Sequence, residues 1–450
     1  MKFLKSFIVI MLVFCFSLGI VACGVEDSGN SELKIGYRAE NAEQILTKKL
    51  CEAFEAKMLQ EGKTVKTKPV SVNAGSYNSE ITRAYNAGTL CDIMYVTDEY
   101  ASVWSENGVF EDLTPYFARD NFDFSAYDAA AFDSAKAWEN KIAYAPRSYD
   151  QIVVYLNLDF FNKYGVAVPT SDNWTWSKLF EICEEFRQKI VEEHGEQDAE
   201  YYRSIDLEIT WQPVYYAMIK AFGGYIIDIS TQTVGLEETA AVNAIKKLDE
   251  MADKKYCPNP GSGSSYFPNG RSAMYVMTRA ACANLERNDI TNVAFLPFPV
   301  FDSAFTGVAD SMAYLPYGST GYAITSTSKQ KDIAFEFVKF ALSEEGQNIM
   351  GRNGSIVPVL KSLQENPDAA WRKGIDILKD IDQSAFIYNS PYVQLFSCYG
   401  RGYNPPTKER TMYDNVRESL KSLNSSKYAD NNIEQFAKDM ADSLKLGLGI

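Results

Sequence analysis

Residues 91–117 read CDIMYVTDEYASVWSENGVFEDLTPYF, and this stretch carries the pattern that decides the fold. Its apolar run Asp92–Val96 predicts a short strand, and the polar residues after Val96 predict a loop at the end of that strand. From residue 33 onward, short apolar strands of this kind alternate with helical patterns. Such alternation indicates an α/β fold built on mainly parallel strands.

The helices are predicted from apolar residues that recur on one face. A stripe with a spacing of four predicts a helix over residues 42–58, and its members are Leu46, Leu50, Phe54 and Met58. Similar patterns predict helices over residues 175–191, with Thr175 as the N-cap, and over 332–350. The other early elements are strands at Leu33–Tyr37 and Lys68–Val72 and a helix through Ile81–Tyr85.

The composition limits the classes of function. The chain has 450 residues and a formal charge of −15 at pH 7, so it lacks the basic surface that nucleic acid requires. The chain is longer than a single hydrophobic core usually supports, which suggests two domains. It has one histidine, His194, and no HExxH motif, so neither a metal nor a cofactor is expected.

The cysteines after the N-terminal segment are widely spaced and form no CxxC motif. Because this spacing gives no disulfide framework, we expect most of them to be small buried apolar residues. They are Cys51, Cys91, Cys183, Cys257, Cys282 and Cys398.

The N-terminus has the features of an export signal. Lys2 and Lys5 precede an apolar run from Phe7 to Ala22, which is short for a membrane span. The end of this run, Gly19–Gly24, resembles a bacterial lipobox, which implies cleavage after residue 22 and acyl chains on Cys23. Residues 23–32 would then be the lipidated cysteine and a flexible tether that holds the protein at the outer face of the cell membrane. An ordinary cleaved signal and an uncleaved N-terminal helix are the alternatives.

Several segments occur in an order that resembles the extracellular solute-binding proteins of the sugar-binding family, receptors of ABC importers of the maltodextrin-binding type. No single motif is diagnostic, but the ordered set covers residues 33 to about 360. The segments are Cys91–Phe117, Asn140–Pro169 with the following Thr175-Trp176, Phe267–Met277 and Gly318–Gln347.

The resemblance implies a type II periplasmic-binding-protein-like α/β fold, in which two lobes are joined by three crossing segments and hold the ligand in a cleft. We expect these crossings near Arg147–Gln151, Tyr275–Thr278 and Gly321–Thr325. Lobe I would then comprise residues 33–147 and 279–321. Lobe II would comprise residues 148–278 and 322–450, with residues 361–450 forming additional C-terminal helices.

Ligands of open α/β sheets bind where the carboxyl ends of the strands meet. A sugar needs polar side chains for its hydroxyls and a flat aromatic ring for its apolar face. The residues that follow the predicted strands and flank the crossings are therefore the candidate ligand contacts. They are Tyr37, Arg38, Glu40, Ser76, Tyr77, Asn78, Asp98, Glu99, Tyr100, Arg147, Ser148, Tyr149, Trp211, Gly223, Gly224, Arg279, Tyr317, Gly318 and Ser319.

The other tryptophans are better explained by packing than by ligand binding. Trp176 begins a predicted helix and is expected in the core, and Trp104 and Trp138 are also read as packing residues. Trp174 could serve either as a sugar platform or as a packing residue.

The resemblance implies a receptor for a mono- or oligosaccharide that closes around its ligand and delivers it to a membrane permease, and we expect a monomer without catalytic activity. Other solutes are alternatives. A peptide is one, a polyamine would suit the acidic chain, and ferric iron would suit the tyrosine pairs Tyr201-Tyr202 and Tyr215-Tyr216. A surface glycosidase is a further alternative, because 59 acidic residues make carboxylate pairs inevitable.

Overall fold

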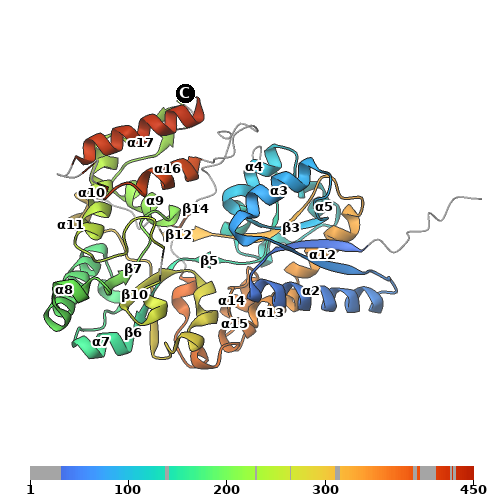
Figure 1. The fold of residues 1–450 in the computed structure, drawn as a ribbon. Coiled ribbons are helices and arrows are strands. Elements are labelled where there is room, and N and C mark those ends of the chain that lie inside the picture. Colours follow the sequence, from blue (N-terminus) through green and yellow to red (C-terminus); the bar gives the residue numbers. More distant parts are fainter. Residues whose placement is uncertain are drawn as a thin grey trace, which may run out of the picture.

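The computed structural model describes residues 32–136, 141–228, 231–263, 265–309, 315–388, 393–395, 412–425, 428 and 432–449. These residues form two α/β lobes that lie side by side, with short central strands between them (Figure 1). The N-terminal helices and strands lie in one lobe, and α16 (Met412–Leu420) and α17 (Ile433–Leu448) lie in the other. The α/β fold class and the two-lobed architecture are therefore confirmed.

The first lobe is built on a five-stranded sheet with the order β2-β1-β3-β13-β4. Strands β1 and β2 are parallel, β1 and β3 are parallel, and β13 is antiparallel to both of its neighbours. The strands are β1 (Leu33–Arg38), β2 (Thr67–Val72), β3 (Ile93–Thr97), β4 (Ala145–Pro146) and β13 (Thr320–Ile324). Its helices are α2 (Asn41–Gln60), α3 (Tyr77–Asn86), α4 (Asp98–Glu106), α5 (Thr114–Arg119), α6 (Ala129–Ser134), α12 (Lys331–Leu342), α13 (Glu344–Gly351), α14 (Lys361–Glu365) and α15 (Ala370–Lys373).

The second lobe is built on a four-stranded sheet with the order β11-β6-β10-β7. Strand β6 is antiparallel to β10 and β11, whereas β10 and β7 are parallel. The strands are β6 (Val153–Asn157), β7 (Arg203–Asp206), β10 (Ser272–Met277) and β11 (Val293–Pro297), with a separate pair β8 (Ile227–Asp228) and β9 (Thr233–Val234). Its helices are α7 (Leu158–Tyr164), α8 (Trp176–Ala199), α9 (Gln212–Ala221), α10 (Thr239–Asp253), α11 (Ser303–Thr306), α16 and α17.

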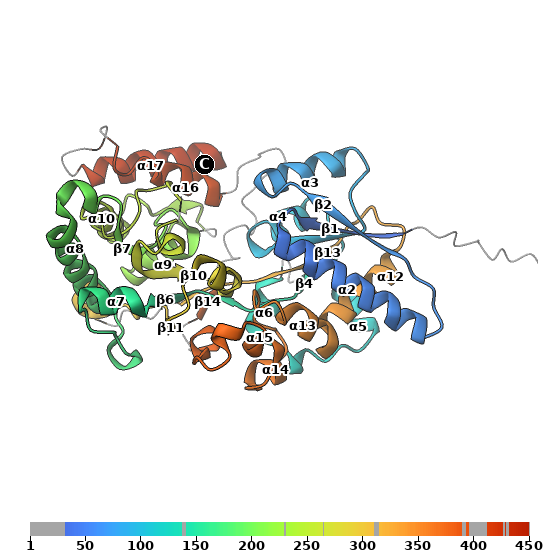
Figure 2. The same cartoon turned by 60° about the horizontal axis from the view of Figure 1, so that its bottom comes forward.

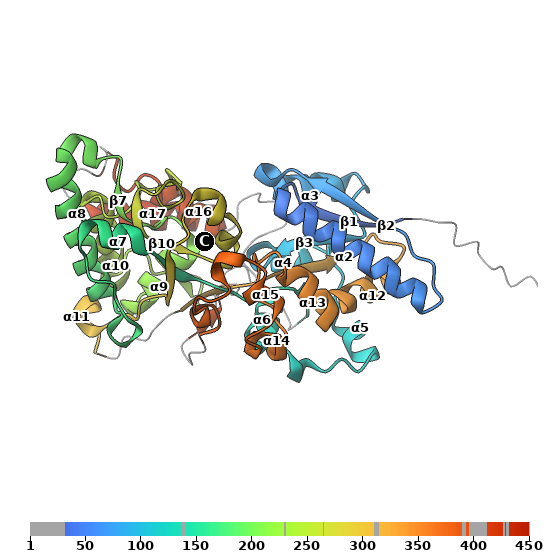
Figure 3. The ribbon, with the colours of Figure 1, turned by 90° about the horizontal axis from the view of Figure 1, so that it is seen from below.

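A third, three-stranded sheet joins the lobes, with the order β14-β12-β5. It consists of β5 (Asp150–Gln151), β12 (Leu315–Gly318) and β14 (Val393–Leu395), one from each passage of the chain between the lobes. Seen from two further directions, these central strands again lie between the lobes, with α14 and α15 close by (Figures 2 and 3). We call this sheet the crossing sheet.

The direction of the strands follows from where the chain enters each lobe. Strand β13 comes directly after the crossing strand β12, and its first residue, Thr320, pairs with Thr97 at the carboxyl end of β3. Strand β6 comes directly after β5, and its first residue, Val153, pairs with Met277 at the carboxyl end of β10. A strand that enters at the carboxyl ends of its neighbours must run antiparallel to them. The carboxyl ends of β3 and β10 therefore face the crossing sheet.

The locations of the crossings differ from the prediction. The first lies where expected, but the others are β12 and β14 rather than Tyr275–Thr278 and Gly321–Thr325. Strand β11 pairs with β6, so this part of residues 279–321 belongs to the second lobe and not to the first. Helices α12 and α13 pack with α2, so residues 331–351 belong to the first lobe and not to the second. Crossing strands of two to four residues carry too little periodicity to be located from the sequence.

The predicted helix over residues 332–350 is two helices, α12 and α13, which meet at Ser343. The ψ of 162° at Ser343 breaks the helical backbone, and its hydroxyl accepts a hydrogen bond from the backbone N–H of Gly346 at 3.2 Å. Ser343 is thus the N-cap of α13, a role for which serine is strongly preferred.

The other predicted elements are confirmed. The stripe from Leu46 to Met58 is buried in α2, and the hydroxyl of Thr175 caps α8 by accepting from the N–H of Lys178. Trp176 is fully buried, and its ring stacks on that of Phe301 with centroids 5.2 Å apart. Trp104 is also buried, between the rings of Tyr100 and Phe110.

Five of the six cysteines lie in the described residues, and all five are buried free thiols: Cys51, Cys91, Cys183, Cys257 and Cys282. The predicted burial of these cysteines is therefore confirmed. Cys398, Trp138, Cys23 and the whole predicted signal segment lie outside the described residues. Of the helices in the described part of the chain, none combines the length and the apolar character that crossing a membrane requires.

Candidate functional site

The carboxyl end of β3 meets the crossing sheet at Asp98. The backbone N–H of Asp98 donates to the carbonyl of Ser319 at 3.2 Å, and its Oδ2 accepts from the N–H of Ser319 at 3.4 Å. A Cβ placed on Gly318 would lie 3.4 Å from the same carboxylate oxygen. The absence of a side chain at residue 318 therefore leaves the Asp98 carboxylate close to the end of β12.

A second carboxylate, that of Asp150, belongs to the crossing strand next to Gly318. Asp150 and Gly318 are paired residues of β5 and β12. The hydroxyl of Ser148 donates to Oδ2 of Asp150 at 2.7 Å, yet Asp150 remains partly exposed. Burial raises the pKa of Asp150 to about 6, although the bond from Ser148 and the charge of Arg147 lower it. Gly318, in a strand that joins the lobes, thus neighbours both acidic residues.

We call the region where the two lobes meet the crossing sheet the junction. Arg147, predicted as a ligand contact, is instead held inside the junction by Glu43. Its Nη1 and Nη2 donate to Oε2 and Oε1 of Glu43 at 2.9 and 2.6 Å, and the Arg147 side chain is 3% exposed. The guanidinium also lies 4.7 Å from the ring centroid of Tyr95. Burial alone would lower the pKa of Arg147, but the charge of Glu43 raises it well above its usual value. Arg147 is therefore a charged structural anchor, with little surface left for a ligand.

Ser319, another predicted contact, belongs to a buried cluster of hydroxyl groups. Its Oγ lies 2.6 Å from Oγ of Ser134 and also bonds the hydroxyl of Tyr144. Tyr317, two residues earlier, lies in β12, but its side chain is not among those described. The cluster around Ser319 fixes the end of β12 to α6 and to the first lobe.

The predicted contacts after β1 and β2 divide into exposed and buried groups. Arg38 and Glu40 are at the surface, where they form an ion pair of 3.1 Å. Tyr37 and Tyr77 are buried, and the hydroxyl of Tyr77 donates to the carbonyl of Tyr95 at 2.8 Å. Ser76 and Asn78 are partly exposed beside Tyr77. Glu99 lies in the first turn of α4, but its side chain is not among those described.

In the second lobe, Trp211 and Gly223-Gly224 lie at opposite ends of α9. Trp211 precedes the helix and is partly exposed, whereas the glycines follow its last residue. A helix of 10 residues is about 15 Å long, so these residues cannot contact the same small group. Trp211 follows β7, which is parallel to β10, so it lies at the carboxyl edge of the second sheet that faces the crossings.

Arg279 and Tyr149 lie on the interior side of the junction. The Nε and Nη2 of Arg279 donate to the carbonyls of Gly354 and Trp371 at 2.9 and 2.8 Å, and its side chain is fully buried. Strand β10, which precedes Arg279, stays in the second lobe instead of crossing. Arg279 follows the carboxyl end of this strand, where it packs on residues of the first lobe. Tyr149 is buried, and its hydroxyl donates to Oε1 of Gln151 at 3.2 Å.

One side-chain contact links α4 in the first lobe with α16 in the second. The hydroxyl of Tyr100 lies 3.3 and 3.4 Å from the two carboxylate oxygens of Asp414. Figure 1 shows these two helices on the same side of the crossing sheet. The lobes therefore approach each other next to Asp98, which begins α4.

Sequence reasoning missed Asp150, Thr320 and Glu43. The candidates at the first crossing ended at Tyr149, one residue before Asp150. Thr320 directly follows the predicted contact Ser319, and its hydroxyl bonds that of Ser148 at 2.7 Å. A search for polar side chains on both sides of each crossing would have found Asp150 and Thr320. The role of Glu43 depends on tertiary packing and left no local signal.

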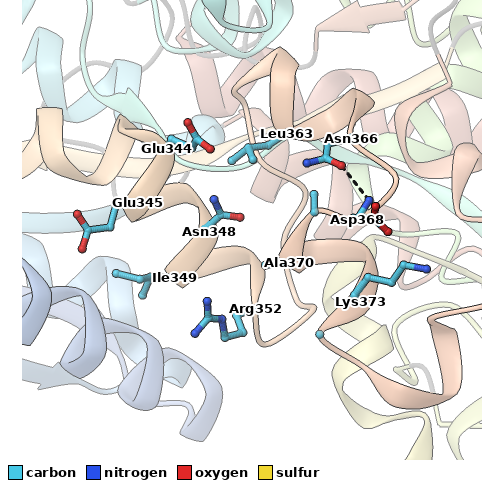
Figure 4. A pocket seen from close by; sticks show the side chains of 12 residues that line it. Glu344, Glu345, Asn348, Ile349, Arg352, Leu363, Asn366, Asp368, Ala370 and Lys373 are labelled. Carbon is cyan, nitrogen blue, oxygen red and sulfur yellow. Dashed lines mark hydrogen bonds between the residues drawn. The ribbon is translucent and has the colours of Figure 1, made fainter.

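A pocket of about 800 Å³ lies away from this junction, between α13 and the segment from α14 to α15 (Figure 4). Glu345 projects from α13, Arg352 directly follows the last residue of α13, and Lys373 projects from α15. None of the predicted ligand contacts lines this pocket. It lies outside the region where the carboxyl ends of the strands meet, so we do not assign the solute to it.

The described residues give no support to a metal site. Within the described ranges, no group of three or more His, Cys, Asp and Glu residues could hold a metal ion. Of the tyrosine pairs, Tyr215 and Tyr216 are both buried in α9, whereas Tyr201 is exposed and Tyr202 stacks on His194. Tyr215 and Tyr216 lie in the core of the second lobe, not at the junction.

Several solved structures with the same fold were determined with a small solute bound. The GacH receptor of Streptomyces glaucescens, determined unliganded and with acarbose, matches with 19% identity and a TM-score of 0.70 over 93% of this chain and 98% of that chain. Lmo0181 of Listeria monocytogenes, an ABC substrate-binding protein in complex with cycloalternan, matches with 18% identity and a TM-score of 0.68 over 93% and 99%. UgpB of Mycobacterium tuberculosis, in complex with glycerophosphocholine, matches with 17% identity and a TM-score of 0.68 over 94% and 99%.

The family assignment comes from the sequence match, because structural likeness at these identities establishes the fold alone. Residues 49–376 match the model of the family described as bacterial extracellular solute-binding protein. This range includes most of α2, every strand of the two main sheets except β1, and two of the three crossing strands. The chain belongs to the bacterial extracellular solute-binding protein family.

Proposed function

We propose that this chain is the substrate-binding lipoprotein of an ABC importer, which binds a carbohydrate between its lobes and delivers it unchanged to a membrane permease. The observation that carries the proposal is the crossing sheet. Its strands β5, β12 and β14 lie where the carboxyl ends of β3 and β10 meet, the place where open α/β sheets bind their ligands.

The side chains at the junction suit a neutral polyhydroxyl ligand. The partly exposed carboxylate of Asp150 accepts hydrogen bonds from hydroxyl groups, and Trp211 offers a flat ring to an apolar sugar face. Hydrogen bonds to a charged group contribute roughly 1.5–3 kcal/mol each, so a few of them would account for micromolar affinity, about −8 kcal/mol. Of the predicted contacts, Arg38, Glu40, Ser76, Asn78 and Trp211 are exposed enough to reach a ligand in this conformation.

The crossing sheet also suggests how binding is signalled. Short paired strands between two rigid lobes can act as a hinge. A ligand that contacts both lobes only when they are close favours the closed form by its extra affinity for that form. Small-angle scattering tests this directly, because closure lowers the radius of gyration on saturation. An unchanged radius on saturation would remove the closure step from the proposal.

The lipid anchor and the permease belong to the proposal as well. The lipobox-like Gly19–Gly24 supports acylation of Cys23, and two or more acyl chains hold a protein stably at a membrane. Mass spectrometry of the N-terminal peptide tests this, because the proposal requires a lipid-modified Cys23 as the first residue. A mature chain that begins elsewhere would exclude the anchor and leave solute binding open.

The experiment that tests solute binding is a ligand screen. A panel of mono- and oligosaccharides, a polyamine, a peptide mixture and ferric citrate is titrated against the purified chain by thermal shift. We expect stabilisation by a carbohydrate and no release of products. Stabilisation by another class of solute alone would assign the ligand to that class. Hydrolysis of a glycoside would contradict the receptor role.

A further inference from the structure

A chain of side-chain hydrogen bonds runs through the junction from Arg147 to Asp150. The Nε of Arg147 lies 3.3 Å from Oγ1 of Thr320, which lies 2.7 Å from Oγ of Ser148. The Ser148 Oγ lies 2.7 Å from Oδ2 of Asp150. The chain therefore joins the first crossing to the first residue of β13.

The protons in this chain can point in only one direction. A guanidinium only donates and an ionised carboxylate only accepts, so the two ends are fixed. Each hydroxyl has a single proton. Ser148 uses its proton on Asp150, so Thr320 must donate to Ser148 and accept from Arg147. Every donor thus points toward the carboxylate of Asp150, and hydrogen bonds aligned in this way polarise and strengthen one another.

The Arg147 end of this hydrogen-bond network is held in place by the carboxylate of Glu43. Glu43, in the first turn of α2, holds the two terminal nitrogens of Arg147 and leaves Nε to face Thr320. The pair neutralises itself, because one carboxylate meets one guanidinium in a two-pronged contact. Ser148 is fully buried, whereas Asp150 is partly exposed. Among the residues of this hydrogen-bond network, Asp150 is therefore the one that can present a charge to a neutral ligand.

We propose that Ser148 and Thr320 are positioning residues that hold the Asp150 carboxylate in the orientation in which it accepts hydrogen bonds from the ligand. This inference rests on the proposed function, because it assigns a role within the same binding site. It makes the affinity depend on two hydroxyl groups, the buried one of Ser148 and the partly exposed one of Thr320, that do not themselves touch the solute.

Several charged and titratable groups face Asp150. Arg147 and Ser148 precede it on the same segment, Glu43 faces it from α2, and Asp98 approaches Gly318, the residue with which Asp150 is paired. The phenols of Tyr95 and Tyr144 are nearby, and burial raises the pKa of both, so they stay neutral at ordinary pH. Asp150 is thus the group whose protonation changes near pH 6 in this set.

The test measures the titration of Asp150 and the ligand affinity in the same variants. The Asp150 carboxyl signal is assigned by carbon NMR with Asp150→Asn, and affinity is measured by calorimetry with a carbohydrate from the screen. In Ser148→Ala we expect the pKa of Asp150 to rise and the affinity at pH 7 to fall about tenfold, the effect of losing one hydrogen bond to a charged group. Ser148→Thr keeps the hydroxyl and should restore both values. Thr320→Val and Thr320→Ser form a second pair, used if the Ser148 variants fold poorly.

Ser125→Ala is the matched control. Its hydroxyl bonds Oδ1 of Asp123 at 2.6 Å, but both residues lie at the surface of the first lobe. This variant should raise the pKa of Asp123 and leave the affinity unchanged. Normal titration and normal affinity in both Ser148→Ala and Thr320→Val would overturn the inference. If no carbohydrate binds the wild type, the proposed function fails, whereas the NMR titration still decides whether the two hydroxyls hold Asp150.

Discussion

Arg147 and Glu43 form a two-pronged ion pair between residues that are 104 positions apart in the sequence. The pair joins the first turn of α2 to the first crossing, and the side chains are 3% and 13% exposed. It replaces the ligand contact that the sequence predicted for Arg147. Its main consequence is mechanical, because it fixes the segment that carries Ser148 and Asp150 to the first lobe.

Removing Glu43 should destabilise the protein strongly. In Glu43→Gln the buried guanidinium loses its counter-charge, and breaking a buried pair in this way costs about 3–5 kcal/mol in the free energy of unfolding. Urea denaturation at pH 7 measures this loss. The matched control is Asp332→Asn, which removes an exposed ion pair with Arg119 and should leave the stability unchanged. Equal effects of the two variants would show that Arg147 is solvated rather than paired.

Asp150 should make stability fall as pH rises from about 4 to 6. Burial raises its pKa to about 6, so the native state keeps a proton that the unfolded state has already lost. The resulting loss of stability is absent when the pH is below the ordinary pKa of an aspartate and complete when the pH is above the raised pKa. Asp150→Asn should therefore raise the free energy of unfolding at pH 7 by roughly 2 kcal/mol and leave it unchanged at pH 4.

Asp249 provides the control for that experiment. It lies in α10 of the second lobe, and burial, with the charge of Asp253, raises its pKa to about 6. Asp249→Asn should stabilise the protein in the same pH range but leave ligand affinity unchanged, whereas Asp150→Asn should weaken binding. A loss of affinity in both variants would indicate an indirect effect of charge.

Arg279 should be required for the contact between the second lobe and residues 354–371. Its guanidinium donates to two backbone carbonyls and lies 4.9 Å from the ring of Phe386. Arg279→Met leaves both carbonyls without donors, at about 1–3 kcal/mol each. Arg279→Lys should not restore stability, because one ammonium cannot reproduce the planar guanidinium. The exposed Arg271 is the control, and Arg271→Met should unfold at the same urea concentration as the wild type.

Substitution of Trp211 should affect ligand affinity, whereas substitution of Trp176 should affect the stability of the fold. Trp211→Ala removes a partly exposed ring at the junction, so it should weaken carbohydrate binding at least tenfold with little change in the melting temperature. Trp176→Ala empties a fully buried site and should cost about 3–5 kcal/mol in stability. Calorimetry and thermal unfolding of both variants check this. Normal affinity in Trp211→Ala would remove this ring from the site.

The sequence was sufficient for the fold class and for several of the elements. The stripe of α2, the cap at Thr175 and the strand before Asp98 are local patterns, so local reasoning found them. The lobe boundaries were harder, because β5, β12 and β14 are too short to show a period of two. The pairing of β11 with β6 is a contact between distant segments, and no nearby residue signals it.

The candidate site was predicted only in outline. Asp98, Gly318 and Ser319 do meet at the junction, as the rule about carboxyl ends of strands implies. Arg147 and Arg279 were predicted as ligand contacts because they lie next to expected crossings, and both are buried with protein partners. Whether an arginine faces solvent or a partner depends on tertiary neighbours such as Glu43 and Trp371, which the local sequence does not identify.

The most direct test of the receptor role is calorimetric titration of the purified chain with a panel of neutral oligosaccharides. A carbohydrate receptor should show saturable binding of one sugar per chain with micromolar affinity, and the sugar should be recovered intact afterwards. No binding by any member of the panel, together with saturable binding of a polyamine, a peptide or ferric iron, would contradict it.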